Sequence, residues 1–155
     1  MNDLEKLQAI EDIKHLKALY FLHLDEQNWR GWIDDVFTPD MEFLAPETKP
    51  EPFVGLDTLL DFVKVMMAGK QSVHHGHMPI ITFKSETEAT GVWAMEDRIY
   101  SVEANAPVER DPIMHGFGHY HDTYVKLDGS WRISASRLTR LRLEVKSVIG
   151  QPGGA

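Results

Sequence analysis

Residues 118–133, with the sequence GHYHDTYVKLDGSWRI, contain the clearest folding signal of this chain. Polar and apolar residues alternate on both sides of Asp128-Gly129, which is the period of a half-buried strand. A type I′ turn needs positive φ at both central residues, and Asp-Gly meets that need. We therefore predict a two-residue hairpin, in which a one-residue slip would invert every later face assignment. The expected cross-strand pairs are Lys126 with Trp131 and Tyr124 with Ile133.

The same period of two extends through the second half of the chain and predicts strands at about 73–83, 89–101, 114–127 and 131–144. The first half differs, because apolar residues recur there every three or four positions. That spacing indicates an amphipathic helix with Asn2 or Asp3 as its cap. The stripe consists of Leu4, Leu7, Ile10, Ile13, Leu16, Tyr20 and Leu24.

Two shorter helices are predicted between the first helix and the strands. One covers about residues 29–36, and Thr38-Pro39-Asp40 is expected to end it before a brief extended piece at 41–44. Residues 45–52 hold three prolines and are predicted to be a loop. Asp57 is the expected cap of the next helix, which Gly69 ends.

Three helices followed by long strands indicate an α+β fold with the helices on one face of an antiparallel or mixed sheet. A strongly curved sheet closed by helices forms a cone around an internal pocket, where small-molecule sites commonly occur. A chain of 155 residues fits one domain. We assign residues 1–149 to that domain and 150–155 to a flexible tail.

Composition excludes several classes of partner. The net charge of −8 argues against nucleic acid, because phosphate binding depends on clustered Lys and Arg. A local basic run is formed by Arg137, Arg140 and Arg142, one of which could serve a ligand anion. The absence of cysteine excludes a disulfide frame and a thiolate nucleophile. The sequence shows neither a secretory signal nor a membrane-spanning stretch, so we expect a cytoplasmic protein with no membrane partner.

Histidines are concentrated in one part of the chain, since six of the eight lie between positions 74 and 121. Asp97 follows on a strand, on the face that also carries Trp93 and Met95. Histidine exchanges protons near neutral pH, so the group predicts acid–base chemistry in a pocket. The alternative is a set of surface or strand-end histidines with satisfied hydrogen bonds. Asp97 must be either buried and paired or outside the sheet, since an unpaired buried carboxylate is costly.

The order of elements and the motifs at 118–124 and 128–133 resemble the SnoaL-like branch of the nuclear-transport-factor-two-like (cystatin-like) superfamily, over about residues 5–145. The resemblance implies a cone-shaped α+β barrel that works without metal or cofactor. It also implies a homodimer or homotrimer formed through the open sheet face. The superfamily includes polyketide cyclases, ketosteroid isomerases, scytalone dehydratase and bile acid dehydratase, as well as binding proteins.

Within that superfamily the pattern is most similar to the dehydratases, which assigns site residues by resemblance. Tyr20 and Asp25 are separated by about 140° around a helix, so both face inward only if the helix frays or curves. His74 and His75 point to opposite faces of a strand, so at most one reaches the pocket. The implied catalytic residues are Tyr20, Asp25, His74 and Asp97, with Arg140 as a late substrate contact.

The resemblance predicts a cofactor-independent dehydratase or isomerase acting on a small hydrophobic, ring-containing, steroid- or polyketide-like substrate. Asp97 would orient His74, which takes a proton from carbon beside a carbonyl group. Tyr20 would donate a hydrogen bond to the developing enolate oxygen. Asp25, or a water that it holds, would protonate the departing hydroxyl.

Two alternatives remain open. The same pocket could bind a small molecule without reaction, with Trp93, Tyr120 and Tyr124 as an aromatic wall. His119 and His121 share one face and could flank the pocket or face a neighbouring subunit. A metal site is the other alternative, because three histidines can hold zinc. The candidate ligands are His74, His75, His77, His119 and His121.

Overall fold

The computed structural model of the chain describes residues 1–102 and 111–146, so the expected tail at 150–155 lies outside the described residues. The helical elements are α1 (Asp3–Asp25), α2 (Trp29–Gly31), the π-helical turn η1 (Trp32–Val36) and α3 (Leu56–Met67). The strands are β1 (Phe37–Leu44), β2 (Phe53–Val54), β3 (Lys70–Gly76), β4 (Ile80–Phe83), β5 (Glu88–Ser101), β6 (Met114–Leu127) and β7 (Ser130–Val145).

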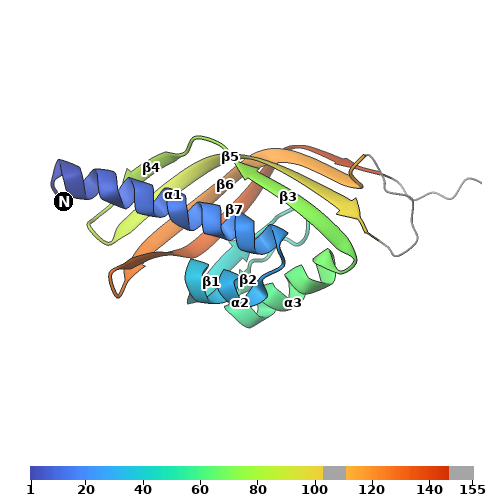
Figure 1. Cartoon of the computed structure of the whole chain (residues 1–155), viewed down its shortest axis with the longest axis horizontal. Coiled ribbons are helices and arrows are strands. Elements are labelled where there is room, and N and C mark those ends of the chain that lie inside the picture. Colours follow the sequence, from blue (N-terminus) through green and yellow to red (C-terminus); the bar gives the residue numbers. More distant parts are fainter. Residues whose placement is uncertain (103–110, 147–155) are drawn as a thin grey trace, which may run out of the picture.

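The strands form one curved, mixed sheet in the order β2-β1-β7-β6-β5-β3, and β4 also pairs with β5. β1 runs parallel to β7, whereas the other pairs are antiparallel. Figure 1 shows the helices on one side of this sheet, where α1 contacts β3 and β7 and α3 contacts β1, β2 and β3. The predicted α+β class, with helices covering one face of a mixed sheet, is confirmed.

The hairpin between β6 and β7 is confirmed in its register. Asp128 and Gly129 have φ of 50° and 83°, as a type I′ turn requires. Lys126 lies opposite Trp131 and Tyr124 opposite Ile133. Because the register is as predicted, the inward and outward assignments along both strands also hold near the turn.

Helix α1 is capped by Asn2, whose side chain and that of Glu5 form a capping box. The predicted stripe is buried only in its later turns. Leu4 and Leu7 are 76% and 61% exposed, since the first turns of α1 lie at the end of the molecule (Figure 1). Lys17, in contrast, is completely buried on the same helix.

Three boundaries differ from the predictions. The strand expected at 73–83 is divided into β3 and β4, and Pro79, which has no N–H for a ladder, lies in the break. Thr38-Pro39-Asp40 belongs to β1, because the pairing of β1 with β7 shifts register between Phe37 and Glu42 and tolerates the proline. The N-cap of α3 is Gly55, with φ of 83°, and Asp57 lies in the first helical turn.

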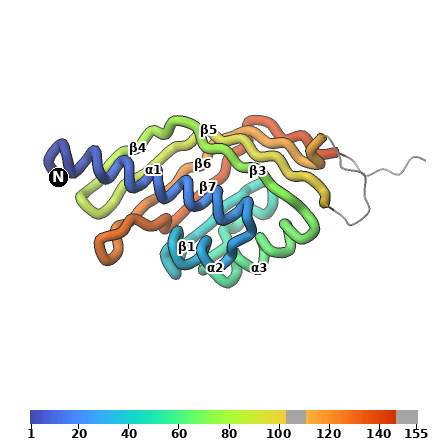
Figure 2. Tube along the Cα trace, in the orientation of Figure 1, coloured from blue at the N-terminus to red at the C-terminus, as the bar shows by residue number. Residues whose placement is uncertain are grey.

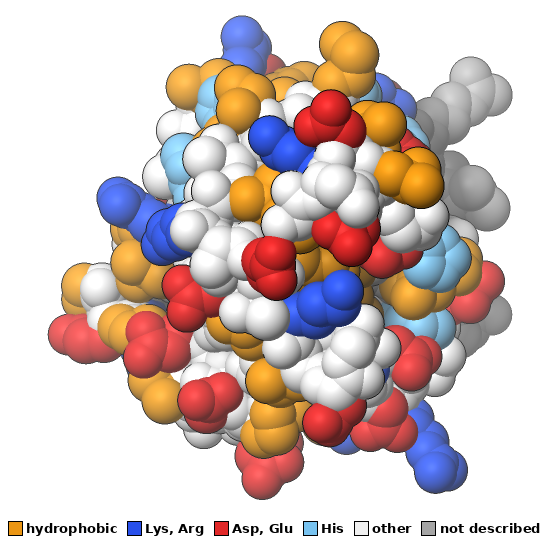
Figure 3. Space-filling model, turned by 90° about the vertical axis from the view of Figure 1, so that its left-hand side faces the viewer, with side chains coloured by type: hydrophobic (Ala, Val, Ile, Leu, Met, Phe, Trp, Pro, Cys, Tyr) orange, Lys and Arg blue, Asp and Glu red, His pale blue; other side chains and the backbone are white. Residues whose placement is uncertain are grey.

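One end of the sheet lies beside the N-terminus. There the ammonium group of Met1 bonds Glu86 in the turn between β4 and β5, which Figure 2 shows beside the start of α1. Figure 3, which views the molecule from this end, shows acidic and basic side chains scattered among apolar and uncharged ones. No helix in the described part of the chain is long and apolar enough to cross a membrane.

Candidate active site

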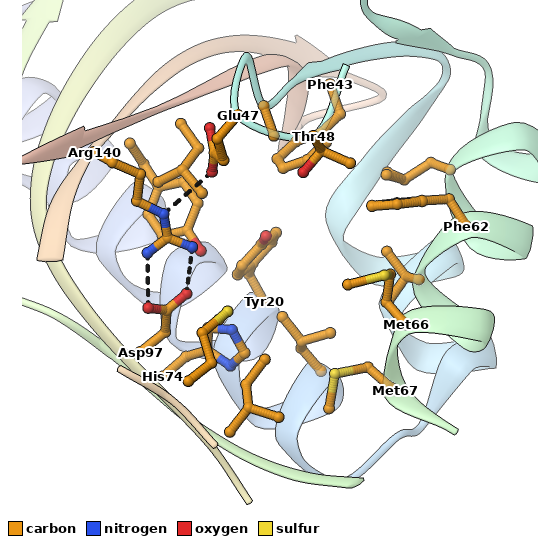
Figure 4. A pocket seen from close by; sticks show the side chains of 18 of the residues that line it. Tyr20, Phe43, Glu47, Thr48, Phe62, Met66, Met67, His74, Asp97 and Arg140 are labelled. Atoms are coloured by element: carbon orange, nitrogen blue, oxygen red, sulfur yellow. Dashed lines mark hydrogen bonds and ion pairs between the residues drawn. The ribbon is translucent and has the colours of Figure 1, made fainter. Parts of the chain in front are cut away.

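A cavity of about 270 Å³ lies between the sheet and helices α1 and α3. Its wall is mostly apolar and aromatic, with Phe62, Met66 and Met67 of α3 on one side (Figure 4). The other side carries the polar side chains, which α1, the loop after β1, and strands β3, β5, β6 and β7 supply. They are Tyr20, Glu47, Thr48, His74, Asp97, Tyr120 and Arg140.

Strand alternation brings the central polar groups into this cavity. His74 is buried and lines the cavity, whereas the neighbouring His75 is exposed, so the prediction that only one of them reaches the pocket is confirmed. Asp97 is 2% exposed on the inward face of β5 and lies opposite His74 across the β3–β5 ladder.

The partner of His74 is Asp25, so the predicted His74–Asp97 pair is wrong. His74 Nδ1 lies 2.6 Å from Asp25 Oδ1. The Asp25 carboxylate also accepts the His74 backbone N–H and the Ser72 hydroxyl, both at 2.8 Å. Asp25 does not line the cavity and reaches His74 from the end of α1. Helix α1 therefore need not fray for Tyr20 and Asp25 to serve one site.

These contacts set the chemistry of the imidazole. A carboxylate facing Nδ1 favours the tautomer in which Nδ1 carries the proton and Nε2 has a free lone pair. Among the described residues, none bonds Nε2. Phe21 stacks on the ring at a centroid distance of 6.3 Å and an interplanar angle of 10°. The carboxylate and the stacked ring thus hold the His74 imidazole in one orientation at the cavity wall.

Asp97 is instead bound by Arg140. Nη1 and Nη2 of Arg140 lie 2.7 Å from the two carboxylate oxygens, and Nε lies 3.1 Å from Oε1 of Glu47 (Figure 4). Burial alone would lower the pKa of Arg140, but the hydrogen bonds and charge of Asp97 outweigh it and raise that pKa. The expectation that Asp97 is buried and paired is confirmed, with Arg140 as the partner.

The side chains of Tyr20 and Tyr120 also line the cavity. Burial raises the pKa of Tyr20, and the negative charge of Asp122 raises it further. Burial also raises the pKa of Tyr120 well above its ordinary value. Both phenols therefore remain protonated and can act as hydrogen-bond donors rather than as bases.

A buried network lies behind the two tyrosines. The Lys17 ammonium is 2.8 Å from Asp122 and stands 4.3 and 3.9 Å from the ring centroids of Tyr20 and Tyr120. Burial lowers the pKa of Lys17, although Asp122 acts in the opposite direction. Tyr124 donates to Asp122, and the Trp93 indole donates to Tyr124, each at 2.8 Å.

Four residues that were candidates for the wall or rim of the pocket do not line it. Trp93 and Tyr124 belong to the buried network and do not line the cavity. His119 lies on the outer face of the sheet, because its neighbour Tyr120 points inward. His121 is exposed on the same outer face and bonds Thr139. Within residues 1–102 and 111–146, no three His, Cys, Asp or Glu side chains gather as a metal-binding group.

Lys17, its partner Asp122, and Glu47 are charged residues of this region that were not predicted from the sequence. Lys17 lies three positions before Tyr20, so helical spacing could have placed it on the inward face. Glu47 lies in the proline-containing loop, where no periodic pattern indicates which side chains turn inward.

Known structures share this architecture. A putative scytalone dehydratase from Novosphingobium aromaticivorans is 24% identical, with a TM-score of 0.79 over 99% of this chain and 100% of that one. A hexachlorocyclohexane dehydrochlorinase from Novosphingobium barchaimii is 18% identical, with a TM-score of 0.76 and the same coverage. A protein of unknown function with a cystatin-like fold from Nostoc punctiforme is 19% identical, with a TM-score of 0.64 over 90% and 93% of the chains.

At these identities the likeness shows the fold and leaves the reaction open. A family model matches directly at the sequence level and covers residues 5–137. The predicted resemblance is thereby confirmed, and the chain belongs to the SnoaL-like domain family.

Proposed function

We propose that this protein is a cofactor-independent lyase or isomerase similar to the dehydratases. It removes a proton beside the carbonyl group of a small hydrophobic, ring-containing molecule of steroid or polyketide type. The observation that carries the proposal is the Asp25–His74 pair at the wall of an apolar cavity. The dehydratase and dehydrochlorinase named above share the fold, which supports this class of chemistry without identifying a substrate.

The reaction begins when His74 Nε2 takes a proton from the carbon beside the carbonyl. The C–H electron pair forms an enolate, whose oxygen accepts a hydrogen bond from the protonated phenol of Tyr20. The enolate then expels a hydroxyl group from the β-carbon. The imidazolium of His74 returns its proton to that oxygen, so that water leaves and a C=C bond remains. Without a leaving group, return of the proton to another carbon shifts a double bond.

Asp25 has a different role from the one that the sequence suggested. Its oxygens already accept three hydrogen bonds, and it does not line the cavity, so it is poorly placed to protonate a leaving group. It instead fixes the tautomer of His74 and stabilises the imidazolium that forms when the proton arrives. Asp97, which was expected to orient His74, instead holds the guanidinium of Arg140 through two hydrogen bonds.

The test compares Asp25→Asn and His74→Ala with the parent protein. Proton removal is measured as hydrogen–deuterium exchange beside the carbonyl of a bicyclic ketone in D₂O, and elimination is measured on a panel of β-hydroxy ketones. Each variant should lose about 10²–10⁴-fold in rate, which is the usual contribution of a general base. Ligand binding, followed by tryptophan fluorescence to which Trp32 in the cavity wall contributes, should be retained.

The matched control is His75→Ala, which removes an exposed imidazole from the adjacent position of the same strand and should leave both rates unchanged. Binding by the parent protein without exchange or elimination would favour the alternative of a small-molecule-binding protein. Equal rates in the parent and His74→Ala would overturn the assignment of His74 as the base.

A further inference from the structure

Glu47 is a polar residue of the cavity wall that the proposed reaction does not use. It lies in the loop between β1 and β2, and its neighbour Thr48 also lines the cavity. Figure 4 shows Glu47 on one side of the Arg140 guanidinium and Asp97 on the other. The side chains of Glu47 and Arg140 are 27% and 13% exposed, so they meet at the cavity wall rather than in bulk water.

Glu47 and Asp97 together occupy both edges through which an arginine binds an anion. A guanidinium presents its donors as a rigid fork, and a carboxylate or phosphate is bound most strongly by two parallel N–H groups. Asp97 takes the edge formed by Nη1 and Nη2. Glu47 takes the Nε side. Nη1 also donates to Met95 Sδ at 3.6 Å, so one N–H of Nη2 remains, and it suits a neutral carbonyl oxygen better than an anion.

The local charge leads to the same conclusion. Two carboxylates face the single guanidinium of Arg140, which leaves this wall with one net negative charge. Asp25 adds another carboxylate behind His74. A ligand carboxylate would add negative charge to a mostly apolar cavity, where an uncompensated charge is costly. An uncharged ketone, alcohol or amide meets no such barrier.

We propose that Glu47 is a specificity-determining residue that restricts the cavity to uncharged ligands. The proposal rests on the proposed function, because it names the class of substrate for the same site. It concerns binding alone, so it can fail while the acid–base chemistry stands.

The test measures the affinity of two matched ligands, 2-naphthamide and 2-naphthoate, by titration calorimetry at pH 7.5. The two probes have the same ring and nearly the same shape but differ by one negative charge. The parent protein should bind the amide at least tenfold more tightly than the carboxylate. Binding of the carboxylate with equal or higher affinity would overturn the proposal, as would failure of both probes to bind.

Two variants separate the effect of charge from that of hydrogen bonding. Glu47→Gln removes the charge and keeps an amide oxygen for Arg140 Nε, whereas Glu47→Ala also vacates that edge of the guanidinium. Both should raise the affinity for 2-naphthoate at least tenfold, with the larger gain in Glu47→Ala, and should leave that for 2-naphthamide within threefold. An unchanged affinity ratio in both variants would contradict the assigned role.

The matched control is Glu51→Gln, which makes the same charge change at an exposed position of the same loop, away from the cavity lining. It should leave both affinities unchanged. A gain in carboxylate affinity equal to that of Glu47→Gln would attribute the effect to the overall charge of the loop and would overturn the proposal. Hydrogen exchange on the bicyclic ketone, measured in parallel, reports separately whether the proposed chemistry is present.

Discussion

Tyr20 is expected to keep its proton throughout the alkaline range of an ordinary assay. Its pKa is raised, so its protonated donor form persists to higher pH than that of a solvated tyrosine, which ionises near pH 10. Tyr20→Phe should lower kcat by about 10²–10³-fold, as loss of one oxyanion donor does. The profile of kcat/KM between pH 8 and 10 should have the same shape in both proteins. An alkaline decline that is present only in the parent would show that Tyr20 ionises there.

Lys17 is expected to contribute to stability through Asp122. Lys17→Met would leave a fully buried carboxylate without its cation, which typically costs about 3–5 kcal/mol of the free energy of unfolding. Asn at position 122 can still bond Ser136 and Tyr124, which now contact Asp122. The double variant Lys17→Met/Asp122→Asn should therefore recover much of the loss in urea denaturation. A double variant as unstable as Lys17→Met would show that the cation contributes through its tyrosine contacts instead.

The sequence and the family resemblance predicted four titratable residues of the site, but neither their pairing nor the presence of Lys17 and Glu47. Inward orientation of His74 and Asp97 follows from strand alternation, which is a local property. The choice of partner depends on the end of α1 lying beside β3, which brings Asp25 to His74. It also depends on the Arg140 side chain crossing β6 from β7 to reach Asp97 on β5. Those arrangements are tertiary, and no spacing along the chain encodes them.

At the scale of elements, two glycines of β6, Gly116 and Gly118, have different neighbours. A Cβ at Gly118 would lie closer than 3.0 Å to the backbone carbonyl oxygen of Thr139, so the strands would have to separate. A Cβ at Gly116 would meet the ends of the Arg140 and Asp97 side chains, which can move.

Gly118→Ala should therefore lower the free energy of unfolding by about 1–3 kcal/mol, in the range of other overpacking substitutions. Gly116→Ala should lower it less but displace the Arg140–Asp97 pair, so its main effect should be weaker ligand binding. Urea denaturation and calorimetry on the same two proteins would compare these effects. Greater loss of stability in Gly116→Ala would contradict the distinction between backbone and side-chain neighbours.

The elements themselves were predictable to different degrees. The β6–β7 hairpin and the capped helix α1 are specified by adjacent residues, and both were confirmed. The division of β3 from β4 was missed, although Pro79 marks it, because apolar residues continue on both sides of the break. The inclusion of Pro39 in β1 was missed because it depends on a register shift against β7, a strand distant in sequence.

At the scale of the whole molecule, the sheet has two unlike faces. The inner face is covered by helices and holds the cavity, whereas the outer face presents half-buried and exposed residues such as Phe117, His119 and Ala94. An uncovered sheet face of this kind suits association with a second copy of the chain. We propose, as the family resemblance suggests, that the protein is a homodimer or homotrimer formed through this outer face.

Ala94→Arg tests that assembly, because it adds a long charged side chain to the outer face. Ala94 lies directly opposite His119 of the neighbouring strand β6. Light scattering coupled to size-exclusion chromatography should then report a monomer where the parent gives a dimer or trimer. Ala18→Arg makes the same change at an exposed position of α1 and should leave the assembly intact. Since the cavity lies on the opposite face of the sheet, monomeric Ala94→Arg should still bind an uncharged ring-containing ligand. An unchanged mass would place the contact elsewhere, and a monomeric parent would exclude the assembly.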